Sequence, residues 1–176
     1  NIYPSLFNVK FCFHETVQKE DIVIMTTLKR SNSKNLDFIT LVKLLDADLK
    51  LRDGDDHYFY AQYNVIENLT FVVLAYSNNA PIGCGAIKAY NDNTMEIKRM
   101  YVVPQERGKG IASKILKELE IWAAEQKYST CILETGLRQP EAIALYRKNG
   151  YATIPNYGKS YDIVFKNPNL TGTKKI

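Results

Sequence analysis

The hydrophobic and polar positions along the chain predict strands and helices in a recognisable order. Short apolar runs bounded by turn residues are typical of strands, and the polar turns 78–79 and 91–93 separate three such runs in succession. Because short turns join neighbouring strands in opposite directions, we expect an antiparallel meander in this part of the chain. The strands predicted for the first half are 22–28, 71–76, 82–89 and 95–103.

Apolar residues at helical spacing predict the helices. The apolar stripe of 110–127 is typical of an amphipathic helix, and Pro140 and Gly150 bracket a later helix. A meander followed by a strand–helix–strand crossover, a helix and a hairpin predicts an α/β fold with a sheet of mixed direction. The further predicted elements are helices at 35–49 and 57–67 and strands at 130–134, 151–154 and 161–165.

Length and composition favour a single domain over residues 25–166. The chain has 176 residues, of which 45% are hydrophobic and 24% are charged, as is ordinary for one globular domain. The pattern opens near Met25, so 1–24 are expected to be an upstream extension or a remnant of cloning, and 167–176 a loose tail. No apolar run approaches the roughly 20 residues that a bilayer requires, and no secretory signal is recognisable. We therefore expect a cytoplasmic protein without a membrane partner.

Charge and cysteine content argue against two further classes of protein. The net charge of +4 is small and the basic residues are dispersed, so a nucleic-acid partner is not expected. The cysteines, Cys12, Cys84 and Cys131, are odd in number, far apart and without a C-x-x-C pair. Neither a zinc site nor a disulfide framework is therefore expected, and we predict no metal.

A glycine-rich turn between a predicted strand and a predicted helix carries the strongest functional signal. The strand stops at Pro104, and the turn holds Gly108 and Gly110. The first amides of a helix have no internal partner, and glycines let a ligand approach the main chain closely. Arg107 and Lys109 add positive charge, and a serine in the first helical turn adds a hydroxyl. This combination predicts an anion site sized for a diphosphate.

The same turn partly matches another nucleotide-binding loop. No G-x-x-x-x-G-K-[ST] string is present, which excludes a Walker loop. The run 108–113 nearly matches a dinucleotide fingerprint, and Glu134 ends the next strand, where a ribose-binding acid is expected. However, 104–107 separate the strand from the first glycine, and only one crossover is visible. A dinucleotide-binding oxidoreductase is therefore the weaker alternative, beside a tight turn with no ligand.

Two segments resemble motifs of the GNAT superfamily of acyl-CoA-dependent N-acetyltransferases. The run 107–112, RGKGIA, is similar to the family signature R/Q-x-x-G-x-G/A, and 141–151, EAIALYRKNGY, is similar to its later A-x-x-L-Y-x-K-x-G-[FY] stretch. Both occur in the family's order, and the likeness covers about 25–165, with small bacterial members of unassigned substrate most alike. The resemblance implies a mixed, mostly antiparallel central sheet with helices on both faces.

The resemblance also implies a reaction. Acetyl-CoA would give its acetyl group directly to a primary amine of a small molecule, an amino-acid derivative or a protein terminus. Tyr146 matches the family tyrosine that protonates the leaving sulfur, and Glu96 is the candidate base for the amine. A core aromatic and a surface carboxylate beside Lys98 are the structural alternatives for these two residues. A non-catalytic acyl-CoA sensor with the same fold is the alternative function, and a homodimer is one expectation from the family.

The family's binding residues carry over by position. Gln139 stands where the family frequently has asparagine, which is a departure from the pattern. The acceptor amine is expected near Asp56, His57, Tyr60 and Tyr157, where acids and aromatics suit a cation. The expected cofactor contacts are Met100, Tyr101, Val102, Arg107, Gly108, Lys109, Gly110, Ile111, Ala112, Ser113 and Gln139.

The strand before the glycine turn shows a break in its alternation. Apolar residues at Met95 and Ile97 are followed by apolar residues at Met100 and Val102, so the phase shifts by one position. One extra residue near Arg99 would explain the shift as a β-bulge. In the family such a bulge lies beside the pantetheine arm of the cofactor. A strand end that is buried on both faces is the other explanation.

Overall fold

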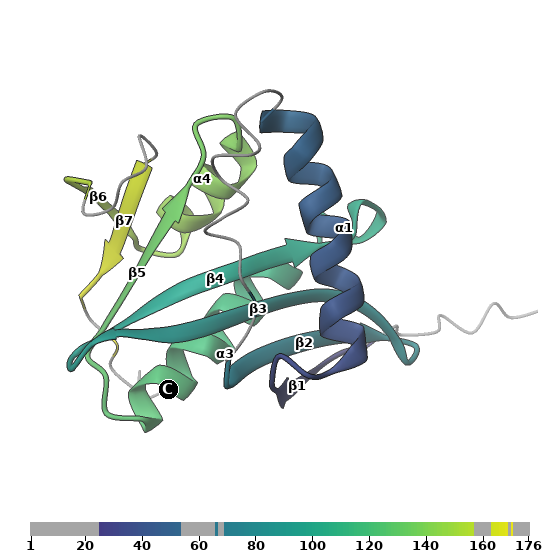
Figure 1. Cartoon of the computed structure of the whole chain (residues 1–176), viewed down its shortest axis with the longest axis horizontal. Helices are drawn as coiled ribbons and strands as arrows, with labels where there is room; N and C mark the ends of the chain where they lie inside the picture. Colours follow the sequence, from purple (N-terminus) through teal and green to yellow (C-terminus); the bar gives the residue numbers. More distant parts are fainter. Residues whose placement is uncertain (1–24, 54–65, 67–68, 157–162, 169, 171–176) are drawn as a thin grey trace, which may run out of the picture.

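A seven-stranded sheet forms the centre of the computed structural model, which describes residues 25–53, 66, 69–156, 163–168 and 170 (Figure 1). The strand order is β1-β2-β3-β4-β5-β7-β6. Among the described strands only the β4–β5 pair is parallel, so the sheet is mixed and mostly antiparallel, as predicted. The strands are β1 (Thr26–Ser31), β2 (Phe71–Ser77), β3 (Ala80–Asn91), β4 (Thr94–Val102), β5 (Thr130–Thr135), β6 (Ala152–Ile154) and β7 (Ile163–Asn167).

Helices cover both faces of the sheet, which confirms the predicted fold class. Helix α1 (Leu36–Asp53) lies on one face, where Phe38 and Leu41 are buried against β2 and β3. Helices α3 (Ile111–Glu125) and α4 (Pro140–Lys148) pack in a second apolar cluster on the other face. The Asn35 side chain starts α1 by accepting hydrogen bonds from the amides of the first helical turn, at 2.9 and 3.3 Å.

The phase shift in β4 is a β-bulge, which is one of the two explanations that the sequence left open. Cys84 and Ala86 are two positions apart on β3, whereas their partners on β4, Tyr101 and Lys98, are three positions apart. Arg99 is the extra residue and has φ 59°. Its guanidinium is buried beneath α1 and bonds to Asp46 at 2.8 Å. The bulge therefore sets the side chains of the last part of β4 in a new phase, next to the glycine turn.

Several boundaries differ from the sequence prediction. β1 begins later than expected, at Thr26, and β3 extends over the flanking turn residues to Asn91. Asn167 ends β7 instead of opening a tail, and the amide of Leu170 bonds to the carbonyl of Ser129 at 3.1 Å. The predicted helix 57–67 and the segment 1–24 lie outside the described residues, apart from Ile66, which is not helical. In the part of the chain that the structure describes, no helix is long and apolar enough to cross a membrane.

Candidate functional site

The neighbouring strands β4 and β5 separate at the middle of the sheet. Their parallel pairing covers only Thr94–Glu96 against Thr130–Ile132. Beyond Glu96 the two strands diverge in Figure 1, and no described strand pairs with β4 on that side. Backbone groups on an unpaired edge are free to bond to an extended ligand as a further strand would. The divergence thus opens the sheet where the bulge and the glycine turn lie.

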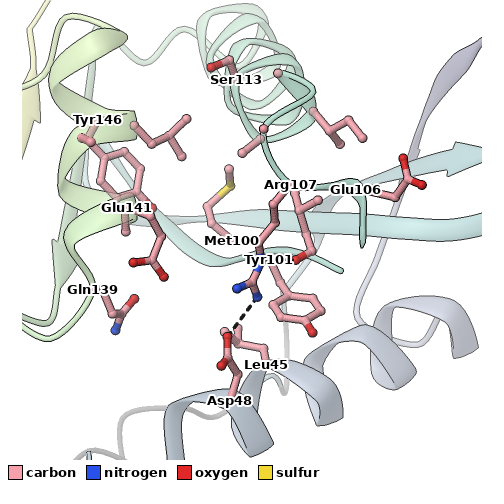
Figure 2. Close-up of a pocket in the computed structure, with 18 of the residues that line it drawn as sticks. Leu45, Asp48, Met100, Tyr101, Glu106, Arg107, Ser113, Gln139, Glu141 and Tyr146 are labelled. Atoms are coloured by element: carbon pink, nitrogen blue, oxygen red, sulfur yellow. Dashed lines mark hydrogen bonds and ion pairs between the residues drawn. The ribbon is translucent and has the colours of Figure 1, made fainter. Parts of the chain in front are cut away.

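A cleft of about 350 Å³ occupies this opening (Figure 2). Its volume falls in the usual range for small-molecule sites, roughly 300–1,000 Å³. Side chains from α1, the end of β4, the glycine turn, the start of α3, and α4 form its walls. Expected site residues that line it are Met100, Tyr101, Val102, Arg107, Gly108, Gly110, Ile111, Ala112, Ser113, Gln139 and Tyr146.

The glycine turn presents free amides to the cleft. Gly110 precedes α3 in the left-handed region, with φ 78°, and none of the described side chains caps the helix. The first helical bond comes from Lys114, so within the described residues the amides of Ile111, Ala112 and Ser113 have no partner. A Cβ added at Gly108 or Gly110 would meet no atom within 4 Å. The turn therefore has both the donors and the space that a diphosphate needs.

The two cations of the turn already have partners. The Arg107 guanidinium bonds to Asp48 of α1 at 3.0 Å and to the carbonyl of Val102 at 2.9 Å. Lys109 bonds to Glu106 at 3.0 Å and does not line the cleft. Both residues therefore bring a positive charge that is already paired with a carboxylate, and of the two Arg107 lines the cleft. The main-chain amides remain the donors for an anion.

Ser113 lies in the first turn of α3 with an oriented hydroxyl. Its oxygen accepts a hydrogen bond from the side-chain amide of Asn149 at 3.0 Å. The same amide bonds to the carbonyl of Leu145 in α4, at 2.8 Å. Because one lone pair of the Ser113 oxygen is taken, its hydrogen can be donated to a ligand in the cleft. Asn149 could not be identified from the sequence, because its partner Ser113 lies on a different helix.

Tyr146 is buried among aromatic rings and also forms part of the wall of the cleft. Its side chain lines the cleft, yet the residue is only 5% exposed. Its ring lies 5.8 Å from that of Tyr151 and 5.9 Å from that of Phe165, between centroids. Burial raises the pKa of the Tyr146 hydroxyl well above its ordinary value of 10.0. The phenol therefore stays protonated, which is the state a proton donor requires.

Glu96 does not belong to the cleft. Its carboxylate accepts a hydrogen bond from Lys98 at 2.9 Å and lies on β4 before the bulge. It does not line the opening that Met100 and Tyr101 line. The structure thus favours the alternative explanation, a strand carboxylate beside Lys98. The residues expected to bind the acceptor, Asp56, His57, Tyr60 and Tyr157, lie outside the described residues.

Charged residues of α1 and α4 also line the cleft, and the sequence did not identify them. Arg52 bonds to Asp48 at 3.3 Å and forms an ion pair with Glu141 across the opening. Partial burial would raise the pKa of the Asp48 carboxyl, but hydrogen bonds from Arg107 and Arg52 outweigh it and hold that pKa below its usual range. Among the described residues, no group of three or more acidic, histidine or cysteine side chains could hold a metal ion.

Comparison with known proteins gives the same fold and a family. The model of the acetyltransferase (GNAT) family matches residues 39–151. The IAA acetyltransferase of Azospirillum brasilense is 38% identical over 87 residues, which are 49% of this chain and 57% of that protein. The chain thus spans little more than half the length of this relative.

Solved structures resemble the chain over most of its length. A Klebsiella pneumoniae protein, provisionally named an acyl-CoA N-acyltransferase, has a TM-score of 0.68 and 31% identity over 82% of this chain and 98% of its own. A GNAT family acetyltransferase from Elizabethkingia anophelis, solved with acetyl-CoA bound, has a TM-score of 0.59 and 20% identity over 80% of this chain and 96% of its own. The second likeness shows the fold alone.

Proposed function

The chain belongs to the GNAT acetyltransferase family, and on this premise we propose that it transfers the acetyl group of acetyl-CoA to a primary amine. The acceptor is a small molecule, an amino-acid derivative or a protein terminus. One observation carries the proposal: the free amides at the start of α3 lie beside the unpaired edge of β4. An anion site and an open strand edge in one cleft suit a ligand with a diphosphate and an extended arm.

Each part of the cleft has a proposed task. The amides of Ile111, Ala112 and Ser113 bind the diphosphate, and the edge of β4 after the bulge orients the arm. Acetyl-CoA supplies the acetyl group as a reactive thioester. The backbone N–H groups near Met100 and Tyr101 stabilise negative charge on the thioester oxygen. Gln139, at the start of α4, adds an amide contact from the far wall.

Tyr146 completes the transfer as the proton donor. The lone pair of the neutral amine forms the new N–C bond while the C–S bond breaks. The sulfur leaves with the bonding electrons and takes the proton of the Tyr146 hydroxyl, whose raised pKa keeps it protonated beforehand. Because Glu96 lies outside the cleft, the proton of the amine passes to water, from which Tyr146 is reprotonated.

The test is turnover of the full chain with acetyl-CoA against a panel of amines, amino acids and peptides with free N-termini. Mass spectrometry should detect an acetylated amine together with one equivalent of CoA. Thermal denaturation with and without CoA should show stabilisation of the fold by the ligand. Stabilisation by CoA without any product would support the acyl-CoA sensor instead, and stabilisation by NAD alone would support the oxidoreductase.

A further inference from the structure

Arg107 makes contacts in three directions, and none of them leads toward the free amides. Its Nε donates to the carbonyl of Val102 at 2.9 Å, at the end of β4. Its Nη2 donates to Asp48 at 3.0 Å, on α1 (Figure 2). Its guanidinium carbon lies 5.5 Å from the centre of the Tyr101 ring. A planar guanidinium held by a carbonyl, a carboxylate and a ring has little freedom to reorient.

Asp48 is itself fixed by a second arginine. Arg52 is one turn further along α1, and it bonds to both oxygens of Asp48 at 3.3 and 3.4 Å. Arg52 also forms an ion pair with Glu141 in the first turn of α4. A continuous line of alternating charges therefore runs from the glycine turn over α1 to α4. Its two arginines and two carboxylates balance each other, so this line presents no net charge to the cleft.

The glycine turn needs support from outside. Gly108 and Gly110 both have positive φ, 80° and 78°, and their missing side chains make no contacts that could hold the turn. Glycine loses more conformational freedom on ordering than any other residue. A ligand that had to order this turn would bind more weakly. Arg107 immediately precedes these residues, and its contacts join the turn to β4 and α1.

We propose that Asp48 is a positioning residue for the glycine turn: by holding Arg107 against α1, it makes Arg107 a brace of the turn and not a ligand of the diphosphate. The proposal rests on the proposed function, because it concerns the cofactor that this function requires. It assigns the affinity for the anion to the main-chain amides and to Ser113. It also makes α1 part of the cofactor site, although α1 carries none of the expected cofactor residues.

The decisive variant is Asp48→Asn, because the two roles of Arg107 predict opposite results. If Asp48 positions the turn, the dissociation constant for CoA rises about tenfold, the change expected for one lost hydrogen bond. If Arg107 is a phosphate ligand restrained by Asp48, its release makes CoA bind more tightly. Calorimetric titration at roughly 1 M salt, where the Debye length is about 3 Å, suppresses the effect of the altered net charge.

Arg107→Lys gives a second and independent reading. This variant keeps the positive charge but loses the planar fork that reaches Val102 and Asp48 together. The brace predicts weaker binding of CoA, and no further loss when Asp48→Asn is added to it. Unchanged affinity in Arg107→Lys, or additive losses in the double variant, would overturn the proposal. In each variant the rise in KM for acetyl-CoA should exceed the fall in kcat.

Glu125→Gln is the matched control. Glu125 is the last residue of α3, forms an ion pair with Arg30 of β1 and does not line the cleft. The Glu125→Gln variant should leave the affinity for CoA unchanged, and a loss equal to that of Asp48→Asn would overturn the proposal. Wild-type protein that binds no CoA would refute the proposed function itself. Wild-type protein that binds CoA, with Asp48→Asn equal to it or tighter, refutes only the role of Asp48.

Discussion

Replacing Gly110 by alanine tests the anion site directly. Gly110 stands immediately before α3 with φ 78°, and an added Cβ would enter open space in the cleft. Gly150, just after α4, offers a matched control. It has φ 87°, its added Cβ would also meet nothing within 4 Å, and it does not line the cleft. The two substitutions therefore impose the same backbone strain but differ in what the new methyl group faces.

The expected magnitudes follow from these geometries. A non-glycine residue in the left-handed region costs about 1–2 kcal/mol, so both variants should lose that much stability to unfolding. In Gly110→Ala the methyl group also displaces the diphosphate from the neighbouring amides. One hydrogen bond to a charged group contributes about 1.5–3 kcal/mol. The dissociation constant for CoA should therefore rise roughly 10- to 150-fold in Gly110→Ala and stay near the wild-type value in Gly150→Ala.

Urea denaturation and calorimetric titration with CoA measure the two quantities separately. The reasoning would be refuted if Gly110→Ala were folded and still bound CoA as tightly as wild type. It would also fail if Gly150→Ala lost affinity to the same extent, because the loss would then report backbone strain and not the position of the methyl group. A titration with adenosine 5′-diphosphate, which keeps the diphosphate but lacks the pantetheine arm, should show the same ranking.

Three further predictions concern single side chains. Tyr146→Phe should lower kcat by a factor of about 100 or more and leave the affinity for CoA unchanged. Because burial raises the pKa of Tyr146, deprotonation of this residue should not lower wild-type activity as the pH rises toward 10.0, and a pH–rate profile checks this. Glu96→Gln should change kcat/KM by less than about twofold, because the Glu96 carboxylate bonds to Lys98 outside the cleft. A larger loss in steady-state kinetics would restore Glu96 as the candidate base. Gly85→Ala should cost about 1–3 kcal/mol in urea denaturation, because its Cβ would lie 2.5 Å from Met100 and 2.9 Å from both Ile115 and Leu119.

The bulge in β4 could be predicted because its cause is local. Side chains on a strand alternate with a period of two, so one inserted residue reverses the phase of every residue after it. The shift from Met95 and Ile97 to Met100 and Val102 records that insertion in the sequence itself. The separation of β4 and β5 could not be predicted in this way. The separation begins after the last paired residues, Glu96 of β4 and Ile132 of β5. These residues lie on strands that a whole helix connects, so no local pattern marks where their pairing ends.

The site could be predicted only as far as its residues follow one another in the chain. The turn and the start of α3 form one continuous segment, so their free amides follow from local rules on helix ends. Tyr146 was found by resemblance, since periodicity alone gives equal support to a core aromatic. The partners Asp48 and Asn149 were missed because each meets its target only after folding, 59 residues from Arg107 and 36 residues from Ser113.

Charge counted along the sequence is therefore a poor measure of the charge that a ligand meets in this cleft. Arg107 and Lys109 suggested a basic site, but Asp48 and Glu106 neutralise them in the folded chain. The donors that remain are fixed by the backbone of α3, so binding an anion requires no long side chain to be ordered. A site of this kind holds the diphosphate by geometry more than by net charge. Its affinity for CoA should accordingly fall only weakly with added salt, whereas a site built on free arginine and lysine side chains would lose affinity steeply.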